Sequence, residues 1–422
     1  MDDTLFLAST VLPIAGEPIS DGAVLVSGSG ITDVGAAGDL KKKHSGIPTR
    51  ELGDGILLPA LVNAHTHLEL GWIREYIAPF STFADWITEI IKAKRNNPDI
   101  GEELKRSVAA GITELIASGV GTVGEISSFE GADREILKSS GLRTVLFREL
   151  FDSDGDSLDG ESFERSKLFE ERPFPHAPYS CSPEFLNQAA ALSRNERIPI
   201  GIHLAESEEE VKLLRGEPNG FEEKVYPLIE REAYPTKASP SPYRFMQGLG
   251  FFDSNRATLV HMVHVSDAEV DDAARREIGV VLCPRSNFFL RVGAPPIKKL
   301  SELKRLGIGT DGLSSNHDLD ILEELRFAHL LSSTALESDA ARFCVYLATL
   351  GGARALFLED KIGSIEPGKD ADLLFLAPQF PSSDPYLSVI SSRTEDVRLL
   401  IVAGRPVHST LKERPGATNK TA

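Results

Sequence analysis

The stretch that decides the fold is residues 58–68, which read Leu-Pro-Ala-Leu-Val-Asn-Ala-His-Thr-His-Leu. The run is short and apolar and closes on two histidines, as expected for a buried strand with a functional end. Successive side chains of a strand alternate between its faces, so His65 and His67 point to the same side and can direct two imidazoles at one ion. Taken alone, the pair is equally consistent with two structural histidines.

Seven more short apolar runs follow, and segments with helical periodicity lie between some of them. One such segment is Phe83 to Arg95, in which Trp86, Ile87, Ile90 and Ile91 share one side. The alternation predicts repeated βα units, and eight strands favour an α/β fold of the TIM-like (β/α)8 barrel type. The seven runs end near residues 122–125, 145–149, 174–176, 200–203, 259–261, 281–284 and 308–311.

The two ends of the chain have a different sequence pattern from the middle. Residues 4–12 and 23–27 are short apolar runs separated by Gly and Asp, and a similar pattern returns only at residues 371–376 and 397–405. Such runs are typical of strands joined by tight turns. We therefore expect the two ends to share one small sheet domain beside the barrel.

Polar residues recur at the C-terminal ends of the predicted barrel strands, where barrel enzymes build their active sites. His203 can add a third imidazole to His65 and His67, and Asp311 can add a carboxylate oxygen. Three histidines and one aspartate suit zinc or ferrous iron with a water in the open position. Each residue also has an ordinary interpretation, since His203 can be a core residue and Asp311 can belong to the turn at Gly312. We favour one metal site because it accounts for all these strand ends together.

Two further residues suit the proton transfers that hydrolysis by an activated water requires. Glu206 lies three residues after His203, so its carboxylate can stand beside the ion and shuttle a proton. It can equally be an acid at the start of a helix, which is the interpretation that we prefer for residues 208–210. His261 ends another strand and can orient the attacking water, whereas His264 is expected to pack or to support its neighbours.

Composition limits the classes of function. The 422 residues include 45 Lys and Arg against 63 Asp and Glu, a net charge of −18 that disfavours nucleic acid as a partner. Cys181, Cys283 and Cys344 have no CxxC spacing, so neither a disulfide framework nor a thiolate zinc cluster is expected. The N-terminus lacks the positive region of a signal peptide, and no apolar run approaches the length of about 18 residues that a membrane helix needs. We expect a cytoplasmic protein that does not enter a membrane.

Several of these motifs together resemble the amidohydrolase superfamily, in the aminohydrolase branch that includes cytosine, guanine, S-adenosylhomocysteine and methylthioadenosine deaminases and the triazine chlorohydrolases. The resemblance covers nearly the whole chain, and residues 362–373 look like the family's return from its barrel to a β-sandwich. It implies sandwich segments at residues 1–57 and 367–422 around a metal-dependent barrel at residues 58–366. The other motifs that carry it are residues 58–68, 176–180, 203–206, 260–264, 283–287 and 309–312.

The resemblance also implies roles for individual side chains. Glu206 would be the proton shuttle, and His261 and Asp311 would assist the water. His176 would contact the substrate, at the position where binuclear relatives carry a carboxylated lysine, so hydrolysis of ring amides is disfavoured. The implied reaction is hydrolytic deamination at an amidine-like ring carbon. Four residues would bind one divalent metal ion, zinc or iron: His65, His67, His203 and Asp311.

The substrate implied by the resemblance is a small molecule that carries a 6-aminopurine on ribose. Asp85 precedes Trp86, at the place where methylthioadenosine and S-adenosylhomocysteine deaminases have an acid that holds ribose hydroxyls. The local alternative is a capping box, in which Thr82 and Asp85 begin a helix. Residues 67–70 and 83–87 look most like the branch that deaminates aminodeoxyfutalosine.

Several alternatives stay open at this point. Arg148 can reach a substrate oxygen, or it can form a structural ion pair with Glu149 or another acid. A guanine or cytosine deaminase, a chlorohydrolase or an imidazolone-type hydrolase would use the same metal face on a different ring. A non-catalytic relative would keep the fold only as a scaffold. A homo-oligomer is compatible with the sequence.

Overall fold

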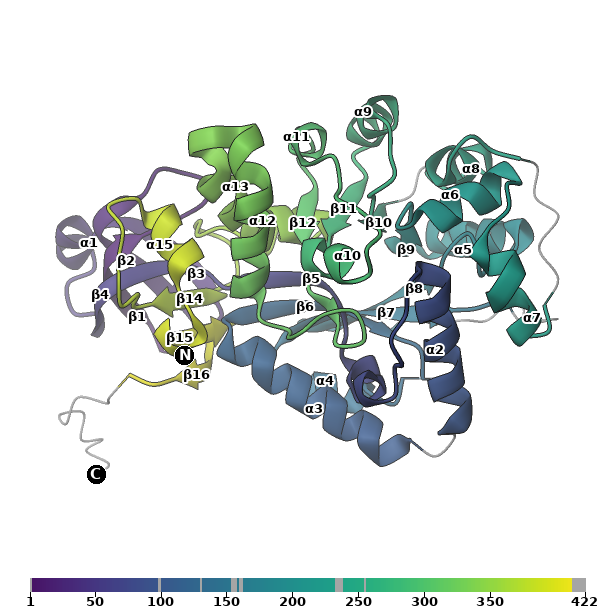
Figure 1. The fold of residues 1–422 in the computed structure, drawn as a ribbon. Coiled ribbons are helices and arrows are strands. Elements are labelled where there is room, and N and C mark those ends of the chain that lie inside the picture. The colour runs from purple at the N-terminus through teal and green to yellow at the C-terminus, as the bar shows by residue number, and fades with distance from the viewer. Residues whose placement is uncertain are drawn as a thin grey trace.

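The computed structural model describes residues 2–97, 100–129, 131–152, 158, 162–231, 238–253 and 256–411. Within these residues the chain is a mixed α/β structure with three sheets (Figure 1). The three cysteines are buried and free, in agreement with the expectation that the chain has no disulfide framework. None of the helices in the described ranges has the length and apolar character needed to cross a membrane.

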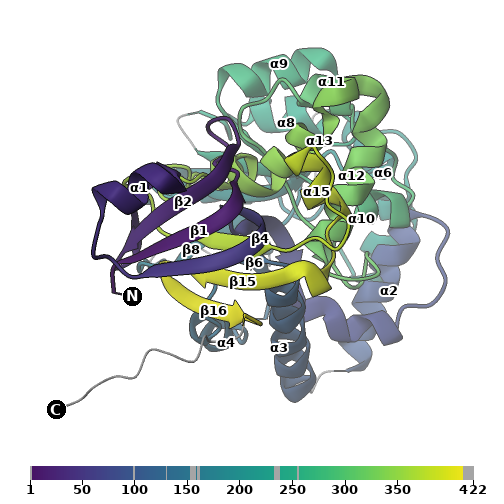
Figure 2. The ribbon, with the colours of Figure 1, turned by 90° about the vertical axis from the view of Figure 1, so that its left-hand side faces the viewer.

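Both ends of the chain form one seven-stranded sheet, as the sequence predicted. Its strand order is β16-β15-β14-β4-β1-β2-β3, and β14 pairs antiparallel with β4 to join the two ends. Figure 2 shows the purple N-terminal strands beside the yellow C-terminal strands. Phe6, Leu57 and Phe375 belong to the apolar core of this sheet. The strands are β1 (Thr4–Val11), β2 (Ile19–Ser27), β3 (Gly30–Ala36), β4 (Thr49–Pro59), β14 (Leu373–Leu376), β15 (Val397–Val402) and β16 (Arg405–Ser409).

The middle of the chain forms two parallel sheets, one in the order β13-β5-β6-β7-β8 and one in the order β12-β11-β10-β9. The backbone N–H of His203 donates to the carbonyl of His176 at 3.1 Å, which joins β9 to the end of β8. The ladders among the described residues do not close into one ring, so the closed barrel stays a prediction. The strands are β5 (Leu61–His67), β6 (Val120–Ser127), β7 (Arg143–Leu150), β8 (Phe169–Pro175), β9 (Ile200–Leu204), β10 (Ala257–His261), β11 (Gly279–Leu282), β12 (Leu306–Ile308) and β13 (Asp311–Gly312).

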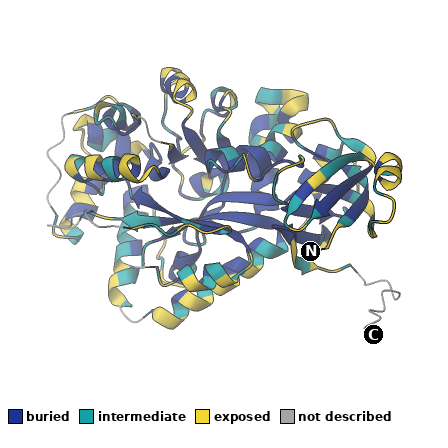
Figure 3. Ribbon diagram, turned by 180° about the vertical axis from the view of Figure 1, so that it is seen from behind, coloured by how far each residue is buried: buried dark blue, intermediate teal, exposed yellow. Residues whose placement is uncertain are grey.

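These strands lie at the eight apolar runs of the sequence, with the last run divided between β12 and β13. Strands β5, β6, β9, β10 and β11 contain only buried residues. Figure 3 shows the parallel strands in dark blue and the exposed residues mainly on the surrounding helices and loops. Parallel strands covered on both faces carry continuous apolar sequence, which explains why the runs do not alternate.

Several helices begin at a polar residue whose side chain accepts a backbone N–H of the first turn, as at Thr82 and Ser182. Thr82 and Asp85 form a reciprocal capping box at the start of α2, which confirms the capping interpretation of this pair. The longer helices are α2 (Phe83–Asn96), α3 (Gly101–Ala117), α5 (Pro183–Glu196), α6 (Glu208–Arg215), α9 (Asp267–Arg275) and α12 (Ile321–Leu336). Shorter helices are α1 (Ala37–Lys43), η1 (Leu68–Glu75), α4 (Arg134–Ser139), η2 (Phe221–Val225), α7 (Tyr226–Leu228), α8 (Pro242–Gly248), α10 (Pro284–Phe289), α11 (Ile297–Leu300), η3 (Glu337–Asp339), α13 (Ala340–Tyr346), η4 (Leu347–Gly351), α14 (Gly352–Ala355), α15 (Pro385–Ser391) and η5 (Thr394–Asp396).

A buried ion pair fastens the seven-stranded sheet to the parallel strands. Arg143 begins β7, and its Nε donates to Asp372 Oδ2 at 3.0 Å while Nη2 donates to Asp370 Oδ2 at 2.8 Å. The side chains of Arg143 and Asp372 are only 3% and 2% exposed. Asp372 also accepts the backbone N–H of Ala403 at 2.6 Å. The guanidinium therefore connects the middle of the chain to the residues that precede β14, and Asp372 in turn binds the residue that follows β15.

Candidate active site

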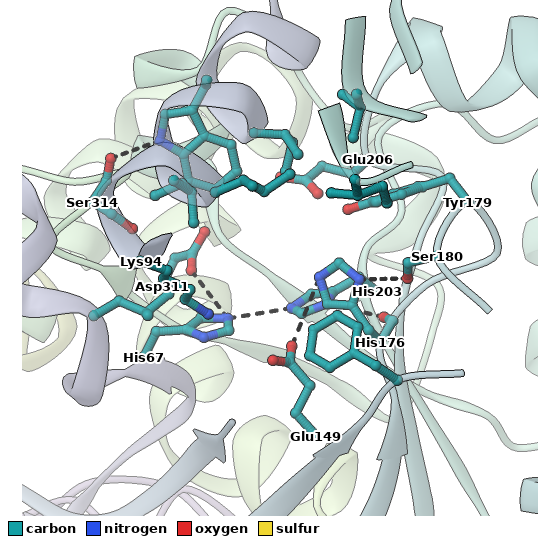
Figure 4. A pocket seen from close by; sticks show the side chains of 18 of the residues that line it. His67, Lys94, Glu149, His176, Tyr179, Ser180, His203, Glu206, Asp311 and Ser314 are labelled. Carbon is teal, nitrogen blue, oxygen red and sulfur yellow. Dashed lines mark hydrogen bonds and ion pairs between the residues drawn. The ribbon is translucent and has the colours of Figure 1, made fainter. Parts of the chain in front are cut away.

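The four predicted metal ligands converge at strand ends, and Figure 4 shows three of them, His67, His203 and Asp311. The Nε2 atom of His203 lies 3.4 Å from Nε2 of both His65 and His67. The Oδ1 atom of Asp311 lies 3.7 Å from Nε2 of the same two histidines. Donor atoms at about 2.1 Å from a tetrahedral ion are separated by about 3.4 Å, so these four atoms fit an ion of the size of zinc.

The protonation states of these side chains also suit a cation. Nδ1 of His203 donates to the carbonyl of His176 at 3.1 Å, so its Nε2 keeps a lone pair. Burial, and then the neighbouring imidazoles, lower the pKa of His67 and of His203 well below the ordinary value. Burial opposes ionisation of Asp311, yet its contacts with His65 and His67 hold its pKa well below the usual range. Neutral imidazoles and an ionised carboxylate are the forms that bind a divalent metal.

The backbone at these strand ends is strained. Non-glycine residues in the left-handed region cost about 1–3 kcal/mol each and gather at functional sites. The carboxylate of Glu210 holds one of the turns, because it accepts the backbone N–H groups of Ala205 at 3.1 Å and of Glu206 at 3.0 Å. Four residues at these strand ends lie in the left-handed region, with φ values of 54° at Ala205, 80° at His261, 50° at Met262 and 59° at Asp311.

Glu206 and His261 lie together beside the metal ligands, with Oε1 of the first 3.6 Å from Nε2 of the second. Burial raises the pKa of Glu206 well above its ordinary value, and the nearby carboxylates of Asp311 and Glu210 add to the rise. Burial lowers the pKa of His261 to about 4. Nδ1 of His261 lies 3.0 Å from Oδ1 of Asn287, an acceptor that keeps the ring proton on Nδ1. A carboxyl whose burial favours its protonated form therefore faces an imidazole nitrogen that can accept a proton.

A cavity of about 340 Å³ is bordered by His67, His203, Glu206, His261 and Asp311. Helix α2 supplies one apolar wall with Trp86, Ile87, Ile90 and Ile91, so its predicted apolar side faces the cavity. The indole Nε1 of Trp86 donates to the carbonyl of Ser314 at 3.0 Å, a bond visible in Figure 4. A concave, mostly apolar site with a few convergent polar groups is typical of small-molecule binding. Further described lining residues are Leu70, Lys94, Glu149, Phe151, His176, Tyr179, Ser180, Val225, Tyr226, Ile229 and Arg231.

His176 lines this cavity, as expected for a residue that meets a substrate. Its Nδ1 lies 2.6 Å from Oγ of Ser180, and its Nε2 lies 3.7 Å from Oε1 of Glu149. Burial lowers the pKa of His176 to about 3, and the Lys94 ammonium acts in the same direction. The imidazole is therefore neutral at physiological pH.

The structure does not bring Asp85 and Arg148 to the described lining of the cavity. Besides its cap bond, Asp85 pairs through Oδ1 with Nζ of Lys224 at 2.7 Å. Nη1 of Arg148 donates to the carbonyl of Ser162 at 2.9 Å, and its guanidinium lies 5.1 Å from the ring of Phe163. Ribose binding by Asp85 and substrate contact by Arg148 stay predictions that this geometry does not support.

Several polar residues of the site were not singled out from the sequence for such a role, and three of them bear on the chemistry. Glu149 and Lys94 line the cavity, and Asn287 orients His261. Glu149 stands at the end of an apolar run, the same signal that identified His203, although in the sequence it is assigned only as an ion-pair partner of Arg148. The amphipathic pattern of residues 83–95 gives Lys94 no distinguishing mark. Asn287 lies within a family motif, but nothing in its spacing connects it to His261.

Comparison with known proteins shows the family of the chain. The chain matches the amidohydrolase family over residues 56–407. This chain belongs to the amidohydrolase family. The amidohydrolase is 32% identical to a 5-methylthioadenosine/S-adenosylhomocysteine deaminase from Desulforudis audaxviator, over 94% of this chain and 91% of the relative.

Two solved structures resemble the amidohydrolase in fold. An adenosine deaminase from Xanthomonas campestris with bound zinc is 26% identical, with a TM-score of 0.78 over 96% of this chain and 92% of that one. An aminofutalosine deaminase from Helicobacter pylori is 24% identical, with a TM-score of 0.82 over 96% of this chain and 99% of that one. At 24% identity, the similarity to the aminofutalosine deaminase shows only that the two folds are alike.

Proposed function

We propose that this amidohydrolase is a metal-dependent deaminase that releases ammonia from a 6-aminopurine nucleoside, either aminodeoxyfutalosine or methylthioadenosine and S-adenosylhomocysteine. The observation that carries the proposal is the group of three imidazoles and one carboxylate, with Glu206 and His261 beside it, at a cavity of about 340 Å³. The relative and the two solved structures described above are all deaminases by name.

The four ligand atoms of His65, His67, His203 and Asp311 would hold one divalent ion, zinc or ferrous iron. Their separations of 3.4 and 3.7 Å support a single ion. The chemistry that such an ion supplies when bound is activation of a water nucleophile near neutral pH.

The remaining side chains would move protons and hold the substrate. Glu206, whose pKa is raised by burial, would donate its proton to a ring nitrogen, then accept the remaining proton of the added water and pass it to the departing ammonia. His261 stays neutral, so its Nε2 can accept the first proton of the attacking water with help from Asp311, and this proton afterwards returns to Glu206, whose Oε1 lies 3.6 Å away. His176 contacts the substrate from the neighbouring strand end.

The finer architecture belongs to the same proposal. The two parallel sheets together would form the (β/α)8 barrel at residues 58–366, and residues 1–57 and 367–422 would form the β-sandwich. A cytoplasmic location and a homo-oligomer stay predictions. The partner of the site would be a small-molecule substrate, and neither nucleic acid nor a membrane would be needed.

The proposal is tested by measuring ammonia release from a panel of substrates by the zinc-loaded protein. The panel contains aminodeoxyfutalosine, methylthioadenosine, S-adenosylhomocysteine, adenosine, guanine and cytosine. We expect turnover of at least one of the nucleosides. Turnover of guanine or cytosine alone, or release of chloride or a ring-opened acid from other rings, would replace the proposal by one of its alternatives.

Two variants separate proton transfer from metal binding. Glu206→Gln should keep the metal and lose about 10²- to 10⁴-fold in kcat, the range of general acid–base catalysis. His203→Ala should lose the metal itself, because it removes one of four ligands. Metal content by elemental analysis and kcat are measured on the same preparations. Full activity of Glu206→Gln would remove Glu206 from its role.

A further inference from the structure

Glu149 is a cavity-lining carboxylate that no step of the proposed reaction uses. It is the next-to-last residue of β7, and its side chain is only 4% exposed. Its Oε1 lies 3.7 Å from Nε2 of His176, the residue expected to meet the substrate. Figure 4 shows Glu149 and Glu206 on different sides of the metal ligands and His176. Glu149 is therefore placed to meet a part of the substrate other than the ring edge that Glu206 serves.

Lys94, on the last turn of α2, lines the same cavity. Its Nζ lies 3.5 Å from Oγ of Ser128 and 4.9 Å from the centre of the Phe129 ring. In the described part of the chain no carboxylate oxygen lies within 4.0 Å of this Nζ. Burial raises the pKa of Glu149 to about 7, while Lys94 and the hydroxyl of Ser128 oppose the rise. At neutral pH the Glu149 carboxyl is therefore only partly ionised, and Lys94 and Arg231 line the cavity with it.

The surroundings of these two groups are mainly apolar. Ile90, Ile91, Phe151 and Ile229 line the cavity with them. The ionised form of Glu149 only accepts hydrogen bonds, and its protonated form keeps one accepting oxygen and gains one O–H donor, so a substrate hydroxyl, which can donate and accept, suits it in either form. A buried carboxylate left without such a donor costs free energy. The site therefore favours a substrate with hydroxyl groups beside the ring.

Asp85, the residue that the sequence offered for sugar hydroxyls, is engaged elsewhere. Its carboxylate caps α2 and pairs with Lys224 at 2.7 Å. Among the described residues that line the cavity, the carboxylates are Glu149, Glu206 and Asp311. Glu206 and Asp311 have their roles at the metal face, which leaves Glu149.

We propose that Glu149, and not Asp85, holds the ribose hydroxyls of the nucleoside and is a specificity-determining residue of this enzyme. The inference rests on the proposed function. The two oxygens of one carboxylate match the two vicinal hydroxyls of ribose, and Lys94 supplies a balancing charge beside them. Two charge-assisted hydrogen bonds of this kind are expected to contribute about 10- to 100-fold to kcat/KM.

The test compares nucleosides that share the reacting base and differ only in the sugar. Adenosine, 2′-deoxyadenosine, 3′-deoxyadenosine and 2′,3′-dideoxyadenosine are assayed with the zinc-loaded wild type, Glu149→Gln and Asp85→Asn. We expect the wild type to prefer adenosine over the dideoxy compound by about 10- to 100-fold in kcat/KM, mainly through KM. In Glu149→Gln the preference should fall below about threefold, with activity on the dideoxy compound kept. Asp85→Asn should keep the wild-type preference.

Several results would overturn the inference. One is a preference that collapses in Asp85→Asn and persists in Glu149→Gln. Another is an equal loss on all four nucleosides in Glu149→Gln, which would place Glu149 in the chemistry or in the fold. If Glu149→Gln does not fold, the double variant Glu149→Gln/Lys94→Met, which keeps the formal charge of the cavity, carries the same test. A wild type that deaminates ribosides and dideoxy compounds equally refutes this inference alone, whereas one that deaminates no purine nucleoside refutes the proposed function as well.

Discussion

Replacing Arg143 by methionine should destabilise the whole fold, because it breaks the buried ion pair between β7 and the residues that precede β14. The substitution removes the donors that reach Asp372 at 3.0 Å and Asp370 at 2.8 Å, and also a bond to the carbonyl of Lys167 at 3.1 Å. Asp370 is 21% exposed and can turn to water, but Asp372 is 2% exposed and, among the described residues, its carboxylate keeps the N–H of Ala403 as its one hydrogen-bond donor. Removing one partner of a buried pair costs about 3–5 kcal/mol, because the other charge is left without compensation.

The loss should depend on pH in a defined direction. Burial raises the pKa of Asp372 and Arg143 opposes the rise, so the variant should have a folded-state pKa that is higher still. Below the ordinary aspartate pKa of about 3.9, Asp372 is protonated in folded and unfolded chains alike, and the destabilisation should be smallest. As the pH rises from there through the raised folded-state pKa, only the unfolded chain gains the full benefit of ionisation. The variant should therefore lose stability progressively toward neutral pH.

Thermal and urea unfolding at pH 4 and pH 8 measure this effect. A second substitution, Asp372→Asn, should recover much of the loss in the Arg143→Met background, because it removes the uncompensated charge and keeps an acceptor for Ala403. Lys138→Met is the matched control, since it removes a partly exposed ion pair with Glu164 and should change stability much less. A small change in Arg143→Met, or no recovery in the double variant, would refute the reasoning.

Two further predictions concern the metal face. Gly309→Ala should weaken zinc binding by about tenfold or more, since a Cβ there would lie 2.7 Å from the backbone N and O of His65 and would displace a metal ligand. Gly38→Ala in α1, where a Cβ meets nothing within 4 Å, should leave zinc content unchanged; equal zinc affinity in both variants contradicts the prediction. Removing metal with a chelator should lower the unfolding temperature, and zinc at about 100 times its Kd should restore about 2.7 kcal/mol. If the unfolding temperature is the same with and without zinc, the four ligand atoms do not form one metal site.

The sequence by itself determined where the strands lie and which of their ends carry chemistry. Parallel strands that are covered on both faces have continuous apolar sequences, so each strand from Leu61 to Ile308 could be located as an apolar run. Candidate metal ligands could be named too, because histidine and aspartate recur at the ends of several of these runs and together suit one ion. Both ends of the chain have short apolar runs separated by turn residues, and this common pattern predicted that they share one sheet.

Only the tertiary structure decided which polar side chains meet in the cavity. Asp85 and Glu149 both lie at the edge of an apolar segment of the sequence. The Asp85 carboxylate caps α2 and pairs with Lys224 outside the lining of the cavity, whereas the Glu149 side chain lines the cavity. The bridge from Arg143 to Asp372 spans more than two hundred residues of chain and has no local signature. Side-chain direction depends on the final hydrogen bond and packing contact at each position. The partners in such contacts are distant in sequence, so a local pattern of residues cannot predict them.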